Sequence, residues 1–321
     1  MAPRPLDPIA RRRHKLRNLL HTWLLAGGSV VLLVATATAL LGPDGILWAL
    51  VFGGISLLTA TGISPQMVLR MYGARPIHAA EFPQGWAILH ELAEKAGLPA
   101  VPRLYYVPSR LMNAFAVGRR ENAAIAVTDG LIRGLTLRQL RCVLAHEISH
   151  VRNGDLRVMA LADVVSRMTG MMSTVGLFML FLNLPYLAAE RVPVPWAGIL
   201  LLMAAPTLGS LFQLALSRAR EYDADLDAAG LTGDPEGLAA ALMLLERRQG
   251  ALWELAMPGV KIPDPSLLRS HPRTEARVAR LMALAGKPGR LPETDDPRPR
   301  IGRSIVPVIR RPRWRATGLW F

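Results

Sequence analysis

Four long stretches without Asp, Glu, Lys or Arg dominate the pattern of hydrophobic and polar residues. They cover residues 18–43, 46–69, 168–189 and 192–217. A helix needs about 20 apolar residues to cross the hydrocarbon of a bilayer, and each stretch is long enough. Core helices of a soluble domain are the alternative, but they fit four runs of this length poorly. The pattern predicts a mainly α-helical membrane protein with four transmembrane helices, arranged as hairpins at residues 18–69 and 161–217.

Basic residues beside these stretches predict their orientation. The chain is 51% hydrophobic yet carries a formal charge of +14, and the connections inside the two hairpins contain one basic residue, Arg191. Because basic flanks remain in the cytoplasm, residues 1–17, 70–160 and 218–321, with both termini, are all expected there. A cleaved signal peptide is the alternative for the first stretch, but its apolar core exceeds the roughly 7–15 residues of a signal.

Between the two hairpins, short alternating runs predict a small antiparallel sheet. They cover residues 103–107, 113–117 and 123–128, and helices are predicted at residues 86–96, 235–249 and 274–285. The run that begins Asn113-Ala114-Phe115 is our candidate for an edge strand. Such a strand is able to pair with an extended polypeptide.

A helix over residues 136–153 has clear signals at both ends. Thr136 and Gln139 fit a capping box, and Gly154 fits a C-terminal stop. An apolar stripe for packing is formed by Leu140, Leu144, Ile148 and Val151. This helix contains the pentapeptide that we take as the main chemical signal of the chain.

That pentapeptide is His146-Glu147-Ile148-Ser149-His150. Residues four apart share one face of a helix, so His146 and His150 are placed to bind one metal ion. Glu147 then lies near a metal-bound water, which is the arrangement of zinc hydrolases. The alternative is an ordinary solvated helix whose three polar side chains have no shared role.

A third metal ligand is expected near the end of the fourth apolar stretch. Glu221 and Asp225 are four residues apart, so Glu221 is placed to bind the metal and Asp225 to accept a hydrogen bond from a ligating histidine. Arg218 is a candidate contact of the Glu221 carboxylate, or a side chain that simply reaches water at the membrane edge. Two crossings separate His150 from Glu221, so the ligands lie on the same side of the membrane.

Three further features have less specific interpretations. His271, in a loop before a helix, is a candidate to hydrogen-bond the oxyanion or a substrate carbonyl, although a histidine without a role fits equally well. The single cysteine, Cys142, is interpreted as a small buried helix residue. Residues 287–321 are rich in Arg and Pro and are predicted to be disordered. Attraction to the anionic leaflet explains their charge, and no nucleic-acid partner is expected.

These motifs together resemble the HtpX family of integral-membrane zinc metallopeptidases, which is related to the prenyl-protein endoproteases. The resemblance runs from about Leu89 to Leu281. It is most specific at Asn113-Ala114-Phe115 with Gly118, at Val143 to His150 with Asn153 and Asp155, at Ser217 to Asp225, and at His271-Pro272 with Arg277.

The resemblance implies a cytoplasmic α+β domain of the gluzincin type that binds one Zn²⁺ through His146, His150 and Glu221. It implies that Glu147 is the catalytic base, that the Asn113 strand binds substrate and that His271 lies near the cleft. It further implies a stress-response protease of the bacterial inner membrane that degrades damaged membrane proteins. The tail after residue 287 lies outside this pattern.

The predicted reaction is hydrolysis of a peptide bond by zinc-bound water, with Glu147 as the general base. A membrane scaffold or chaperone-like protein with a structural zinc is the alternative. Structural zinc usually has four protein ligands, many of them cysteines, whereas three ligands of the catalytic type are found here. A zinc hydrolase that acts on other substrates is a second alternative, and the candidate edge strand argues against it.

Overall fold

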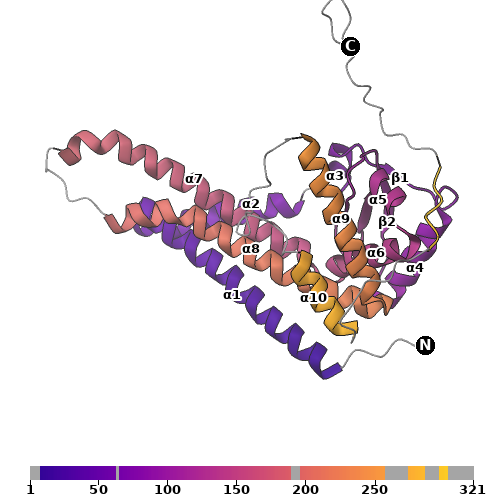
Figure 1. Cartoon of the computed structure of the whole chain (residues 1–321). Coiled ribbons are helices and arrows are strands. Elements are labelled where there is room, and N and C mark those ends of the chain that lie inside the picture. The colour runs from indigo at the N-terminus through magenta and orange to yellow at the C-terminus, as the bar shows by residue number, and fades with distance from the viewer. Residues whose placement is uncertain (1–7, 63–64, 189–195, 257–273, 286–295, 303–321) are drawn as a thin grey trace, which may run out of the picture.

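The computed structural model describes residues 8–62, 65–188, 196–256, 274–285 and 296–302. Figure 1 shows an elongated group of helices that extends from one side of an α+β unit. We call the first part the bundle; it consists of α1 (Pro8–Leu41), α2 (Gly45–Gly62), α7 (Asp155–Ala188) and α8 (Trp196–Thr232). The second part, which we call the sheet domain, contains all the strands and the remaining α-helices. The mainly helical prediction is confirmed.

The bundle is held together by a narrow core and is apolar on its outside. A short 3₁₀ turn, η1 (Gly42–Asp44), joins α1 to α2. Leu33, Ala37, Ala49 and Val165 are buried between α1, α2 and α7. Large apolar side chains on the outer faces, including Trp23, Phe52 and Phe181, are exposed. Apolar residues on every side of a helix are typical of helices in a bilayer.

Two helices among the described residues are long and apolar enough to cross a membrane. They are Val164–Leu182 and Gly198–Thr232, which overlap the third and fourth predicted stretches. In the described parts of α1 and α2 the apolar segments are shorter, Ala26–Ala39 and Gly42–Ile55. Two membrane helices are therefore supported by length and composition, and a total of four stays a prediction.

The second predicted stretch, residues 46–69, continues beyond the helix that it contains. α2 ends at Gly62, and a separate helix, α3 (Pro65–Met71), begins three residues later. Leu69 of α3 is buried against the sheet, in contact with Val107, Ala124 and Ala126. Leu69 thus packs in the sheet domain, and the lack of charge in the sequence did not distinguish this packing from contact with lipid.

The sheet is mixed, so the prediction of an antiparallel sheet is wrong. Its strands are β1 (Arg75–Pro76), β2 (Arg103–Val107), β3 (Ala114–Val117) and β4 (Ala124–Thr128), in the order β1-β2-β4-β3. β4 lies between β2 and β3. It pairs antiparallel with β3 but parallel with β2. β1 was not predicted. β3 lies at an edge of the sheet, as predicted.

One face of the sheet shares a single core with α6 (Leu137–Asn153) and several other helices. These are α4 (Pro83–Ala96), α5 (Asp129–Gly134), α9 (Pro235–Ala256) and α10 (Thr274–Ala285), together with the C-terminal third of α8. The predicted ends of α6 are confirmed: Thr136 and Gln139 form the capping box, and Gly154 has a φ of 70°. Leu140, Leu144 and Ile148 are buried, so the opposite face of α6 turns toward α8.

Candidate metal centre

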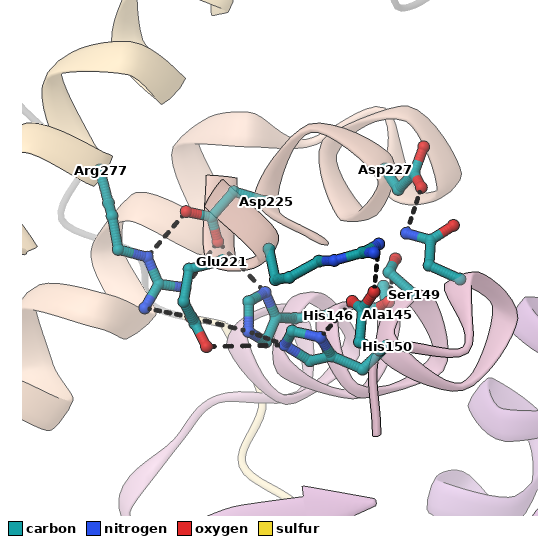
Figure 2. Close-up of polar contacts among 11 residues, drawn as sticks. Ala145, His146, Ser149, His150, Glu221, Asp225, Asp227 and Arg277 are labelled. Atoms are coloured by element: carbon teal, nitrogen blue, oxygen red, sulfur yellow. Dashed lines mark hydrogen bonds and ion pairs between the residues drawn. The ribbon is translucent and has the colours of Figure 1, made fainter. Parts of the chain in front are cut away.

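His146, His150 and Glu221 meet where α6 packs against α8 (Figure 2). The Nε2 atoms of the two histidines are 3.2 Å apart. Glu221 Oε2 lies 3.4 Å from His146 Nε2, and Glu221 Oε1 lies 3.7 Å from His150 Nε2. The structure thus brings together the three residues that the sequence predicted as ligands, although about 70 residues of chain separate His150 from Glu221.

These separations fit a tetrahedral metal ion. Ligand bonds of 2.0–2.2 Å at a tetrahedral centre require ligand atoms roughly 3.3–3.6 Å apart. The donor set of two imidazoles and one carboxylate is that of catalytic zinc sites, in which a fourth position stays open. The residues present therefore fit a divalent metal such as zinc.

The outward nitrogen of each histidine lies beside a carboxylate. Asp225 Oδ1 lies 3.1 Å from His146 Nδ1, which is the contact predicted for Asp225. Asp155 Oδ2 lies 2.8 Å from His150 Nδ1. A proton on each Nδ1 that faces a carboxylate leaves the Nε2 lone pair free for a metal.

Two arginines balance these carboxylates. Arg277 of α10 donates to both oxygens of Asp225, at 2.7 and 2.6 Å, and its Nη1 lies 2.9 Å from Glu221 Oε2. Arg220 Nη1 donates to Asp155 Oδ1 at 2.8 Å. Burial would lower the pKa of Arg277, but the two carboxylates outweigh it and raise that pKa. Arg277 thus remains charged and compensates the buried acids.

The roles of Asp155, Arg220 and Arg277 were not found by reasoning from spacing. Asp155 follows the Gly154 stop and begins α7, and the other two lie 65 and 122 residues further along the chain. The sequence shows that these residues are charged, but it does not identify the side chains that they contact. The predicted contact between Arg218 and Glu221 stays a prediction, and His271 lies outside the described residues.

Opposing effects act on the titration of His146 and Glu147. Burial would lower the pKa of His146, but Asp225 and Glu221 raise it to about 10 in the absence of a metal. Burial raises the pKa of Glu147, while the two histidines and a hydrogen bond from the Ala116 N–H act in the other direction. That hydrogen bond places Glu147 directly beside the edge strand β3.

A two-histidine, one-carboxylate centre with a second carboxylate beside an edge strand is the arrangement of a metallopeptidase. Residues 80–285 match the sequence model of Peptidase family M48, and the chain belongs to this family. The prediction of a metalloendopeptidase and the resemblance to the HtpX family are both confirmed.

Relatives named "Protease HtpX homolog" match most of the chain. The relative from Methylibium petroleiphilum is 37% identical over 281 residues, which are 83% of this chain and 98% of the relative. The relative from Acidiphilium cryptum is 39% identical over 287 residues, with 84% and 97% covered. Among solved structures, Ste24p from S. mikatae has a TM-score of 0.49 at 20% identity and covers 84% of this chain and 66% of that one. The family match, the names of the relatives and the two candidate membrane helices together identify the protein as a membrane-associated metalloprotease.

Proposed function

We propose that this protein is a zinc-dependent endopeptidase that cleaves misfolded or damaged membrane proteins at the cytoplasmic face of a bacterial inner membrane. Its role would be quality control of envelope proteins under stress. The observation that carries this proposal is the convergence of His146, His150 and Glu221, with Glu147 beside the edge strand β3.

Zinc is the metal that this donor set favours, because imidazole and carboxylate ligands at these separations suit a small tetrahedral ion. One Zn²⁺ per chain would supply a water of pKa about 7 and polarise the scissile carbonyl. His146 and His150 would bind it through Nε2, and Glu221 through its carboxylate. Asp225 and Asp155 hold the two imidazole rings in the orientation that this requires.

Glu147 is assigned the role of general base. Its carboxylate accepts a proton from the attacking water and then returns it to the leaving amine, which makes cleavage possible near neutral pH. Burial raises the pKa of Glu147 and so brings its basicity closer to that task. His271 is proposed to stabilise the oxyanion, on the sequence pattern alone.

The position of the site favours membrane-protein substrates. Two site residues, Asp155 and Glu221, lie on α7 and α8, the same helices that carry the candidate spans. A polypeptide that leaves the bilayer would therefore reach the site without crossing a large soluble domain. The distribution of basic residues supports four spans with both termini and the site in the cytoplasm.

The first experiment compares purified wild type, Glu147→Gln and Glu94→Gln in detergent. Glu94 is exposed on α4 and serves as the matched control. We expect about one zinc per chain in all three proteins, with cleavage of an unfolded membrane protein lost in Glu147→Gln alone. Loss of a general base typically costs about 10²–10⁴-fold in rate. Equal cleavage by all three would contradict the proposal, and zinc without cleavage in any of them would favour a scaffold.

The orientation is tested by labelling single cysteines with a membrane-impermeant maleimide. Cys142 is 1% exposed and burial raises its pKa to about 12, so the native thiol gives little background. From outside the inner membrane we expect a label on Asp44→Cys, in the turn between α1 and α2, and none on Glu94→Cys until the membrane is opened. The reverse pattern would place the site outside the cytoplasm.

A further inference from the structure

The side chains of β3 alternate between two differently packed faces of the sheet. Ala116 packs with Ile125 in the main core, on the side of α6. Phe115 and Val117 pack on the other side, with Leu69 of α3. The residues of any chain that pairs with β3 would alternate in the same way, because side chains opposite one another lie on the same face.

α3 runs along β3 in the opposite direction. A methyl group on Gly118, just after β3, would meet Cγ of Pro65 at 3.2 Å. Seven residues later, the ring of Tyr72 lies 4.9 Å from the ring of Phe115, centroid to centroid. Tyr72 is 57% exposed and Phe115 is half-buried. An aromatic pair therefore stands open on the side of β3 that faces away from α6.

The outer edge of β3 lies at Glu147. Asn113 exchanges hydrogen bonds with Thr128 of the β4 strand, so the alternation of the ladder points the backbone groups of Ala114 and Ala116 away from β4. The Ala116 N–H indeed donates to Glu147. A peptide bond that is hydrolysed with Glu147 as the base must then lie next to β3, and the substrate chain must pass Phe115.

We propose that Tyr72 and Phe115 form a specificity site that receives a large apolar side chain of the polypeptide substrate. This inference rests on the proposed endopeptidase function. A substrate residue opposite Ala116 points toward α6 and the metal centre. Its neighbour opposite Phe115 points to the other face and lies against the Tyr72 ring. The site thus selects Phe, Leu, Met or Tyr at one fixed position close to the cleaved bond, which suits segments of membrane proteins.

The test measures cleavage-site selectivity with the purified full-length protein in detergent with zinc. Wild type, Tyr72→Ser, Tyr72→Phe and Met71→Ser each digest the same mixed peptide library, and mass spectrometry reads the cleaved bonds. Met71 is the matched control, because it is adjacent, apolar and 78% exposed. We expect wild type, Tyr72→Phe and Met71→Ser to enrich apolar residues at the same position.

For Tyr72→Ser we expect that enrichment to disappear. Its kcat/KM should fall about tenfold for peptides with Phe or Leu at the selected position, since a hydrophobic contact of this size discriminates by about that factor. Peptides with Ser at this position should be cleaved at the wild-type rate. A structural role of Tyr72 would instead lower cleavage of both kinds of peptide.

Three results would overturn the inference alone while cleavage remains dependent on Glu147. The first is an unchanged selectivity in Tyr72→Ser, and the second is an equal loss for all peptides. The third is a loss of cleavage by Tyr72→Ser that appears in phosphatidylglycerol-containing vesicles but not in detergent, which would make the pair a lipid contact. Absence of Glu147-dependent cleavage by wild type would instead reject the proposed function, and this inference with it.

Discussion

In the bundle, large apolar side chains such as Phe178 and Leu182 point outward, whereas in the sheet domain those of Leu144 and Ile125 are fully buried. Both regions are built from the same residue types, but they arrange them for different surroundings. The bundle suits a lipid environment, and the sheet domain excludes water from an interior core. The metal centre lies at the junction, because α8 runs from one region into the other.

The largest effect that would sharpen this contrast is expected from a pair of leucine truncations. Leu144→Ala should lower the free energy of unfolding by about 2–5 kcal/mol, because it leaves a cavity in the core beside the metal helix. Leu182→Ala, at a side chain that is 57% exposed, should change it by less than about 0.5 kcal/mol in detergent. Denaturant titration of both variants checks this, and similar losses in the two would break the comparison.

The junction itself is tested at Asp155, which begins α7 and contacts His150. Asp155→Asn keeps the shape of the side chain but removes the charge that faces both His150 and Arg220. We expect the affinity for zinc to fall about 10–100-fold, as for other partners of metal-bound histidines. Competition with a fluorescent chelator measures this. Asn153→Ala, a nearby change at the end of α6, should lower the affinity for zinc much less.

A smaller and pH-dependent effect is expected where α6 meets the start of α9. Burial would raise the pKa of Asp234, but hydrogen bonds from Arg138 at 2.5 and 2.6 Å and from the Gly237 N–H lower it. A lowered pKa stabilises the fold above the unfolded value of about 3.9, and this contribution disappears as the pH falls through the folded value.

Asp234→Asn should therefore lower the free energy of unfolding by about 1–3 kcal/mol at pH 6–8. The difference from wild type should shrink below about pH 4. Glu81→Gln, which breaks an exposed pair with Arg75, is the control and should have little effect at any pH. A constant difference between pH 3 and pH 8 would show that the Asp234 charge is not responsible.

The features that the sequence alone determined depend on residues that lie close together along the chain. The capping box at Thr136, the spacing of His146 and His150 and the pairing of Glu221 with Asp225 are all set within one helix, where a fixed rise and turn convert spacing into geometry. Two of the four apolar stretches likewise overlap helices that are long and apolar enough to cross a membrane, because length and lack of charge are local properties. These features were sufficient to predict the three candidate ligands that the structure brings together, and the class of enzyme.

Tertiary structure decided which distant elements became neighbours. β4 lies between β2 and β3, Leu69 of α3 packs against the sheet, and Asp155 and Arg277 reach the candidate metal ligands from separate helices. From the sequence alone, an apolar or charged residue has several possible contact partners. The choice among them depends on the packing energy of the whole fold, which no short window of sequence contains.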